Sequence, residues 1–171
     1  LMNCFNGEKY LHEAINSVLI QTYSNWEIIF WDNRSTDKSA KIFKSYKDKR
    51  LKYFLSPNHS NLGEARRRAF EKTKGELVAV LDVDDIWDKN KLEKQIKVFE
   101  DSSVGIAISN VRIFNDNNEK SFFKFKPPSG YVFDSLLSNY FVCLPSLIIS
   151  KIHVKKLKYH FDNEFDYISD F

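Results

Sequence analysis

The chain has few glycines and no glycine-rich loop. Only five of its 171 residues are glycine, and none forms a GxG arrangement, so the dinucleotide-binding fingerprint and the Walker A phosphate loop are both absent. The four histidines, at positions 12, 59, 153 and 160, show no HExxH or other zinc-binding spacing. No serine occupies a GxSxG elbow. The negative charge of a phosphate-bearing ligand would therefore have to be neutralised by other groups, such as a cation.

Cysteines and long apolar runs are also scarce. Cys4 and Cys143 lie far apart and outside any CxxC pattern, which argues against a disulfide framework and is typical of a reducing compartment. No apolar run approaches the ~20 residues that a membrane-spanning helix needs. The first residues lack the features of a signal peptide and resemble the tail of a strand, and the last stop without a helix ending. We therefore expect a chain trimmed at both ends.

The charge is weakly positive and dispersed. The formal net charge is +3, and the basic residues are spread along apparent helices, so we expect no nucleic-acid partner. The densest basic spots are Arg66 to Arg68 and the group formed by Lys155, Lys156 and Lys158. These spots either contact anionic ligands or lipid headgroups, or they form ordinary solvated surface.

Helix and strand patterns alternate along the first part of the chain. Apolar spacing predicts helices over 8–21, 35–47, 63–74 and 89–100, and strands over 27–32, 51–56 and 76–82. This order predicts an α/β fold with a mostly parallel central sheet flanked by helices on both faces. Beyond Ser103 we expect a less regular, mixed or antiparallel second half, with strands over 104–115, 120–126 and 145–150 and a short helix within 131–140. We interpret residues 1–171 as one domain.

Polar segments follow three of the expected strands. They are "NCFNG" (3–7), "DNRSTD" (32–37) and "DVDD" (82–85). In open α/β sheets, ligands bind at the carboxyl ends of the strands, where the strand order reverses. We therefore expect the three segments to meet around one crevice.

The acidic segment after the strand over 76–82 is the strongest candidate for a metal site. Asp82 and Asp84 point the same way on a strand and could hold one hard cation, Mg²⁺ or Mn²⁺. Waters and substrate phosphate oxygens would complete its shell, and the cation would stabilise a departing diphosphate. The alternative is that one aspartate caps the next helix while the others face water. The buried run before the motif and the "IW" after it favour the metal.

Three segments together resemble family 2 glycosyltransferases of the GT-A fold. They are "FNGEKYLHEAINSVLIQTYSNWEIIFWDNRSTDKS", "NLGEARRRAFEKTKGELVAVLDVDDIW" and "FDNEFDYISDF", and the resemblance covers essentially the whole chain. It implies a Rossmann-like sheet, a nucleotide-diphospho-sugar donor, a divalent metal and inverting transfer of the sugar to an acceptor hydroxyl. Residues 1–103 would form the nucleotide-sugar-binding half and residues 104–171 the acceptor-side half.

The resemblance also implies roles for residues that bind the nucleotide. Phe5 stands where the family has an aromatic residue that stacks on the nucleobase, unless it packs in the core, and Asn3 lies beside it at the base or ribose. Asp32 and Asn33 match the paired acids that hold the base edge. The second acid is Asn here, whose carbonyl oxygen can accept from a pyrimidine N3–H without charge assistance. This departure leaves UDP-, dTDP- and GDP-linked donors open.

Further roles follow for the helix over 63–74 and the acidic segment. Arg66 matches the arginine of the family's "AR" segment and lies near the nucleotide, unless it is a surface charge. Asp82 falls near the sugar and ribose and shares the metal. Asp84 becomes the direct metal ligand, and Asp85 contacts the sugar or lies behind the metal ligands.

Asp170 matches the family's general base. Its carboxylate would accept the proton of the acceptor hydroxyl while that oxygen attacks the anomeric carbon. The preceding position, which is usually acidic, is Ser169. A catalytically impaired module that only binds a nucleotide-sugar is therefore a first alternative. A haloacid dehalogenase-type phosphatase is a second, although in that class the Asp-x-Asp motif follows the first strand of the core and here three strands precede it.

The resemblance finally implies a biological setting. Such enzymes often extend bacterial surface polysaccharides or lipo-oligosaccharides on the cytoplasmic side of the membrane. The expected partners are the nucleotide-sugar donor and a glycan or lipid-linked acceptor, with peripheral membrane contact through the basic spots. The donor sugar, acceptor, linkage and oligomeric state are open.

Overall fold

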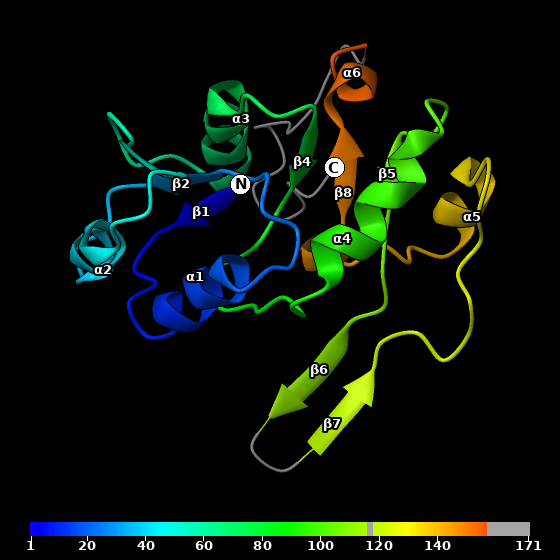
Figure 1. Cartoon of the computed structure of the whole chain (residues 1–171), viewed down its shortest axis with the longest axis horizontal. Coiled ribbons are helices and arrows are strands. Elements are labelled where there is room, and N and C mark those ends of the chain that lie inside the picture. Colours follow the sequence, from blue (N-terminus) through cyan, green and yellow to red (C-terminus); the bar gives the residue numbers. More distant parts are fainter. Residues whose placement is uncertain (116–117, 157–171) are drawn as a thin grey trace.

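Three parallel strands form one half of a central sheet in the computed structural model, which describes residues 1–115 and 118–156 (Figure 1). Strands β1 (Met2–Cys4), β2 (Ile28–Asp32) and β3 (Leu51–Leu55) pair in the order β1-β2-β3. Asn3 lies opposite Trp31, and Trp31 lies opposite Phe54. All residues of β1 and β2 are buried, which explains why their sequences lack the alternation of a half-exposed strand.

The other half of the sheet is antiparallel. Strand β8 (Ile148–Ser150) pairs with both β4 (Leu77–Ala79) and β5 (Ile106–Ala107). The Leu1 nitrogen donates to the Ala79 carbonyl at 2.7 Å, and the Leu81 N–H donates to the Leu1 carbonyl at 3.0 Å. This pattern is that of a parallel pair and joins the halves in the order β3-β2-β1-β4-β8-β5. The strand order therefore reverses between β1 and β4.

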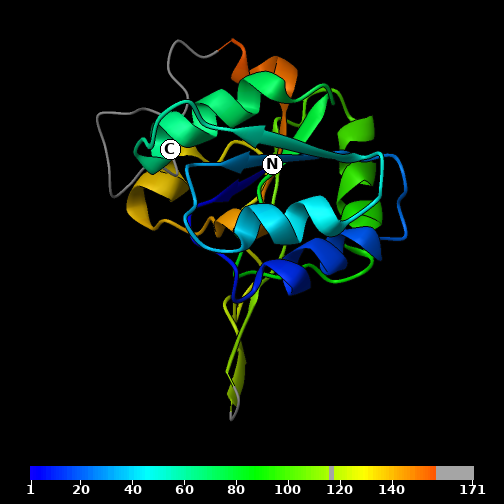
Figure 2. The ribbon, with the colours of Figure 1, turned by 90° about the vertical axis from the view of Figure 1, so that its left-hand side faces the viewer.

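Helices cover both faces of the sheet (Figure 2). On one side lie α1 (Leu11–Leu19) and α2 (Ser39–Ser45), which bury Ile15 and Phe43 against Phe30. On the other lies α3 (Leu62–Lys72), whose Ala65 and Ala69 pack on Ile29 and Trp31. Small alanines at this contact let α3 lie close to the sheet. The predicted α/β class, with a mostly parallel sheet between helices, is confirmed.

The second half is less regular, as expected. Helix α4 (Lys91–Ile96) continues as a 3₁₀ turn, Lys97–Glu100. The remaining short helices are α5 (Phe133–Ser138), a 3₁₀ turn over Leu144–Ser146, and α6 (Lys151–Val154). None of the helices in the described ranges has the length and apolar character needed to cross a bilayer.

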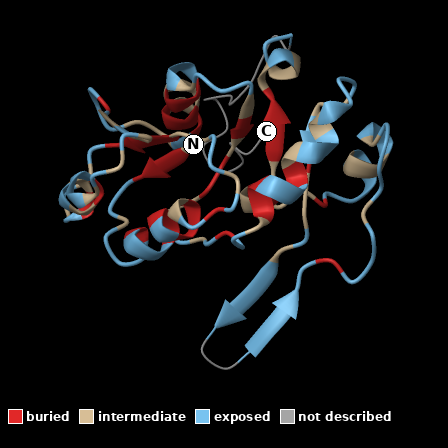
Figure 3. Ribbon diagram, viewed as in Figure 1, coloured by how far each residue is buried: buried red, intermediate tan, exposed pale blue. Residues whose placement is uncertain are grey.

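Among residues 1–115 and 118–156, strands β6 (Arg112–Asn115) and β7 (Asn118–Ser121) pair only with each other, as an antiparallel hairpin. The hairpin projects from the body of the molecule, and all of its strand residues are exposed (Figure 3).

Four expected strands differ from the observed ones. The strand expected over 120–126 is wrong beyond Ser121, where β7 ends. The strand expected over 145–150 is shortened to β8, because a 3₁₀ turn occupies Leu144–Ser146. The strand expected over 76–82 is assigned only over Leu77–Ala79, although Val80 and Leu81 are also buried and the Leu81 N–H bonds to the Leu1 carbonyl.

The strand expected over 104–115 is divided into β5 and β6. Between β5 and β6, Oδ1 of Asn110 accepts the N–H groups of Val111 and Phe123, both at 2.9 Å. These side-chain bonds take the place of backbone hydrogen bonds between strands.

Candidate functional site

A cleft of about 490 Å³ opens beside the carboxyl ends of β1 and β2. This volume lies within the range of small-molecule sites. The cleft adjoins β1, one of the two strands between which the strand order reverses, and open α/β sheets bind ligands near such a reversal. Its walls come from the end of β1, the turn after β2 and the β3–α3 loop. The lining residues are Asn3, Cys4, Phe5, Asn33, His59, Ser60, Asn61, Leu62 and Ala65.

Asn3 lines this cleft with an amide that has no protein partner. Its side chain is 7% exposed, and within the described residues neither Nδ2 nor Oδ1 makes a hydrogen bond. A buried amide without partners costs a few kcal/mol, so such groups call for an explanation. A ligand with matching donors and acceptors would provide it.

Phe5 and His59 form an aromatic wall of the cleft. Their ring centroids are 4.3 Å apart with the planes inclined by 48°. Phe5 is 51% exposed, so the alternative in which it packs in the core is wrong. The Asn33 carbonyl lies 2.9 Å from Nδ1 of His59. Because a carbonyl only accepts, Nδ1 carries the proton, and Nε2 of the neutral ring is an acceptor.

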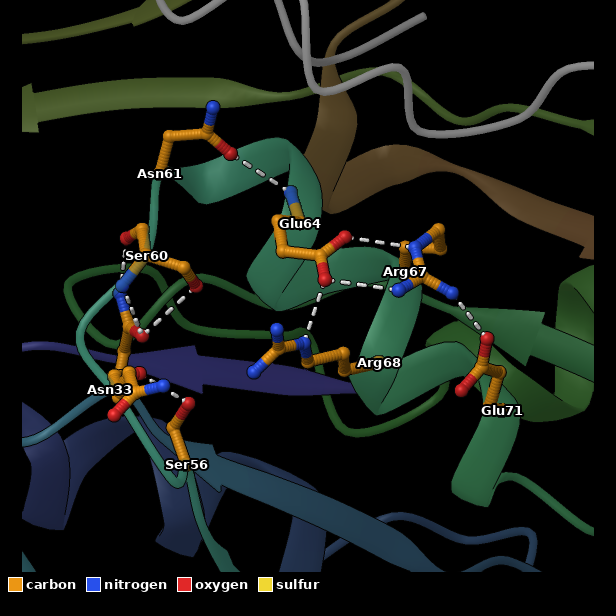
Figure 4. A network of polar contacts seen from close by, with 9 residues as sticks. Asn33, Ser56, Ser60, Asn61, Glu64, Arg67, Arg68 and Glu71 are labelled. Atoms are coloured by element: carbon orange, nitrogen blue, oxygen red, sulfur yellow. Dashed lines mark hydrogen bonds and ion pairs between the residues drawn. The ribbon is translucent and has the colours of Figure 1, made fainter.

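Asn33 holds the loop that carries His59 (Figure 4). Its Nδ2 donates to the Ser60 carbonyl at 2.7 Å, while its Oδ1 accepts the Ser60 N–H at 3.1 Å. The amide thus pairs with the backbone of Ser60 as a neighbouring strand would. A carboxylate could not donate to the Ser60 carbonyl, which gives a structural reason for Asn where the resemblance leads one to expect an acid. The contact of Asn33 with the edge of a base stays a prediction.

Asp32 lies next to the cleft but does not line it. Its side chain is 1% exposed, Oδ1 accepts the Ser35 N–H at 2.7 Å, and Oδ2 accepts the Tyr53 hydroxyl at 2.6 Å. Burial, followed by the bond to Asp32, raises the pKa of Tyr53. These contacts fix the turn after β2, and the base-edge role of Asp32 remains a prediction.

The three consecutive arginines of α3 point in different directions. Arg66 is 2% exposed, and its Nη2 lies 3.3 Å from Oδ1 of Asp82, so the surface-charge alternative is wrong. Arg67 and Arg68 instead bond to Glu64 on the helix surface, at 2.7 and 2.6 Å (Figure 4). Glu64 is in the first turn, where its N–H donates to Oδ1 of the N-cap residue Asn61 at 3.0 Å.

The acidic turn after β4 is partly buried and crowded with negative charge. Asp84 is exposed, whereas Asp82 and Asp85 are half-buried. Burial, followed by the charges of Asp82 and Asp84, raises the pKa of Asp85 to about 6. Within residues 1–115 and 118–156, no group of three or more His, Cys, Asp or Glu side chains could by itself hold a metal ion. Any cation here would need ligands from a substrate or water to complete its shell.

Gly7 brings the loop after β1 against this acidic turn. A Cβ atom built on Gly7 would lie 2.7 Å from Cγ2 of Val83, closer than side-chain contacts allow. Val83 lies between Asp82 and Asp84, so the absence of a side chain at Gly7 lets the β1 and β4 ends approach. The cleft and the acidic turn are thereby neighbours, as the polar strand ends suggested.

The structure therefore brings Asn3, Phe5 and Asn33 into one cleft and Arg66 to Asp82. The carboxylates of Asp82, Asp84 and Asp85 are beside the cleft, not in its wall. The predicted general base Asp170 lies outside the described residues. The β3–α3 loop was not identified from the sequence as part of the site. The only local feature there was Asn61, a residue type that favours the start of a helix.

Comparisons with known proteins identify the family to which this chain is similar. The profile of glycosyl transferase family 2 matches residues 1–149. A β-1,3-glucosyltransferase of Escherichia coli that acts on N-acetylglucosamine-diphosphoundecaprenol is 29% identical over 167 residues, which is 98% of this chain and 65% of the relative. A putative teichuronic acid biosynthesis glycosyltransferase of Bacillus subtilis is 30% identical over 147 residues, covering 84% of this chain and 58% of the relative.

A solved structure shows the same fold. Staphylococcus aureus TarS, residues 1–349 in complex with UDP, superposes with a TM-score of 0.84 at 24% identity, covering 99% of this chain and 51% of TarS. The fold is thus that of GT-A glycosyltransferases. The chain spans about two thirds of the E. coli relative and about half of that TarS structure.

Proposed function

Because the chain belongs to glycosyl transferase family 2, we propose that it transfers a sugar from a nucleotide-diphospho-sugar to an acceptor hydroxyl with inversion at the anomeric carbon. The observation that carries the proposal is the placement of the cleft beside the acidic turn, near the reversal of strand order. Family membership leaves the phosphatase alternative without support. Residues 1–103 provide the donor half in this proposal, and residues 104–171 the acceptor half.

The cleft receives the nucleoside part of the donor. The base lies against the ring of Phe5, where stacking supplies affinity without demanding one base. Asn3 offers an amide donor and acceptor that have no partner among the described residues, and these groups suit the edge of a base or the ribose. UDP-, dTDP- and GDP-linked sugars are the donor candidates.

The acidic turn suits the diphosphate together with a divalent ion. Mn²⁺ or Mg²⁺ would be held by Asp84 and Asp82, and its charge would neutralise the departing diphosphate. The raised pKa of Asp85 supports this fit, because crowded carboxylates that resist ionisation gain from a nearby cation. Asp85 contacts the sugar in this arrangement, and Arg66 keeps Asp82 in place.

Proton transfer at the acceptor is assigned to Asp170. Its carboxylate accepts the hydroxyl proton as the oxygen forms a bond to the anomeric carbon and the bond to the diphosphate breaks on the opposite face. The acceptor is a glycan or lipid-linked saccharide of the surface-polysaccharide type, and the reaction takes place on the cytoplasmic side of the membrane. The named relatives support this setting, since one acts on a diphosphoundecaprenol-linked sugar.

The decisive experiment measures the thermal unfolding midpoint of the chain with a panel of UDP-, dTDP- and GDP-sugars, each with and without Mn²⁺. We expect one nucleotide class to raise the midpoint only when the metal is present, because the diphosphate and the acidic turn share it. Asp84→Ala should abolish most of that shift. The matched control is Asp88→Asn, four residues further on, which keeps the oxygen that accepts the Asn90 N–H at 3.0 Å.

A metal-dependent shift that survived Asp84→Ala unchanged would contradict the ligand assignment. Metal-dependent binding without transfer, in a protein that includes the remaining length of its relatives, would favour the impaired binding module. In an active protein, Asp170→Asn should retain donor binding and lose transfer.

A further inference from the structure

Large apolar side chains are exposed together on and after the β6–β7 hairpin. Between 44% and 88% of the side-chain surface is exposed at Ile113, Phe114, Phe122, Phe125, Tyr131 and Phe133. We call residues 111–133 the aromatic–lysine segment; its described parts are 111–115 and 118–133. An apolar cluster of this size is unusual on a protein surface that contacts only water.

The hairpin has one mainly apolar side. Ile113 lies opposite Lys120 in the antiparallel register, and the Phe122 N–H continues the ladder by donating to the Val111 carbonyl at 2.8 Å. Because strand side chains alternate, Ile113, Lys120 and Phe122 share a face. The other face carries Phe114 together with Arg112 and Glu119, whose charges pair at 3.2 Å.

Lysines are interleaved with these rings. Lys120, Lys124 and Lys126 are all exposed, and within the described residues none of them forms an ion pair. The stretch 120–126 contains three positive and no negative side chains. The segment therefore offers rings and uncompensated positive charge on the projecting hairpin and on the stretch of chain that follows it.

The hairpin also lacks structural support of its own. It pairs with no other strand in the part of the chain that the structure describes, and an isolated two-stranded hairpin is marginally stable in water. It projects away from the sheet in both perpendicular views (Figures 1 and 2). A partner that accepts the rings would stabilise it.

We propose that the aromatic–lysine segment binds the surface of an anionic lipid bilayer. Aromatic rings settle at the boundary between headgroups and acyl chains, and each lysine near an anionic surface adds about 1 kcal/mol. A bilayer also needs no complementary groove, and the exposed rings are spread along the hairpin and the chain after it. This surface differs from the basic spots at Arg66 to Arg68 and Lys155 to Lys158, and it contributes no residue to the nucleotide cleft.

Membrane binding by this segment is independent of sugar transfer, but its purpose rests on the proposed function. A lipid-linked acceptor is confined to the bilayer, so an enzyme held there meets it in two dimensions. The cleft residues are contributed by residues 3–65, and the segment can therefore be altered without touching the donor site.

The test is co-sedimentation of the chain with vesicles that contain phosphatidylglycerol, compared with vesicles of phosphatidylcholine alone. We expect binding to the anionic vesicles and its loss at high salt. Lys120→Gln/Lys124→Gln/Lys126→Gln should weaken binding about 100-fold at low salt. Ile113→Ser/Phe122→Ser/Phe125→Ser should leave only weak, salt-sensitive binding.

Two matched controls separate this surface from others. Ile20→Ser/Val98→Ser removes apolar side chains that are 62% and 46% exposed elsewhere, and Lys155→Gln/Lys156→Gln removes a competing basic spot. Both should bind like the parent chain. The unfolding midpoint with and without UDP-sugar and Mn²⁺ is recorded for every variant. Retained nucleotide shifts with lost vesicle binding support both proposals, whereas vesicle binding without any nucleotide shift counts against the proposed function alone.

The lipid proposal is overturned if the parent chain stays in the supernatant with anionic vesicles, or if the lysine variant binds as well as the parent. Sedimentation velocity without lipid supplies a second criterion. If the parent chain self-associates and the apolar variant is monomeric, the segment is an interface between copies and not a membrane surface.

Discussion

The Nη2 atom of Arg66 lies 3.3 Å from Oδ1 of Asp82, and this pair joins α3 to the acidic turn after β4. Arg66 is 2% exposed, while the Asp82 side chain retains 34% of its exposure. The arginine is therefore held in a dry environment beside a carboxylate that still reaches the site. Such a pair is expected to fix the position of the turn more than to add net stability.

Removing either member of the Arg66–Asp82 pair should destabilise the fold, because the remaining charge loses this partner. Arg66→Met removes the charge that faces Asp82, and Asp82→Asn removes the opposite one. We expect each single variant to lower the free energy of unfolding by about 1–3 kcal/mol, and the double variant to lose less than the sum. Urea unfolding of the four proteins of the cycle measures the coupling. Additive losses would mean that the two side chains do not interact in solution.

Asn33→Asp should destabilise the cleft although it restores the acid that the family resemblance leads one to expect. The new carboxylate would face the Ser60 carbonyl, which now accepts from Nδ2 at 2.7 Å. We expect a loss of about 1–3 kcal/mol in unfolding free energy and weaker nucleotide binding. Thermal unfolding and UDP titration check this, with Asn16→Asp on α1 as a control. If the variant bound UDP more tightly at unchanged stability, Asn33 would act chiefly at the base edge.

Phe5→Ala should weaken nucleotide binding without unfolding the chain. The ring is half exposed and contacts His59, so its removal leaves the core intact but takes away the stacking surface. Stacking on an aromatic ring is worth about 1–3 kcal/mol per base, so the Kd for the nucleotide should rise about 10- to 100-fold. Isothermal titration with Mn²⁺ present measures it. Tyr10→Ala, at a ring 42% exposed, is the control and should leave Kd unchanged.

Lys91 makes the stability of the fold depend on pH. Its side chain is 8% exposed, and its Nζ lies 4.4 Å from the Trp87 ring centroid. Within the described residues, Nζ has no hydrogen-bond partner. Burial lowers the pKa of Lys91 to about 7, against 10.5 in an unperturbed chain. The unfolded state therefore binds more protons between these values, and stability rises with pH across that window.

Replacing Lys91 should accordingly stabilise the protein most at low pH. Below pH 7, Lys91 is charged in both the folded and the unfolded state. Burying its ammonium group then costs about 5 kcal/mol, which the contact with the Trp87 ring offsets by about 2 kcal/mol. We expect Lys91→Met to raise the unfolding free energy by about 3 kcal/mol at pH 6 and to lose this gain by about pH 10. Urea unfolding at several pH values tests it. A gain that did not change with pH would show that packing, not ionisation, is responsible.

Much of the architecture was predictable because its causes are local. The apolar spacing of 8–21 predicted a helix, and α1 forms there with Leu11, Ala14, Ile15 and Val18 buried. The continuous apolar run of β2 predicted a buried strand, and all of its residues are buried. These signals depend on a helical period near 3.6 and on strands covered on both faces, and both can be read within a few residues. The predicted cleft residues Asn3 and Phe5 followed from the family resemblance.

The rest could not be predicted because it depends on contacts between distant segments. The family resemblance singled out Arg66 among the three consecutive arginines, but only the structure shows that it pairs with Asp82 while Arg67 and Arg68 pair with Glu64. His59 joins the cleft because Asn33 holds its loop from 26 residues away. The sequence alone determined the α/β fold, the acidic strand end and the family, since these depend on residue order and short-range periodicity. Tertiary structure decided which polar groups meet, because loops take their conformations from long-range hydrogen bonds and close packing.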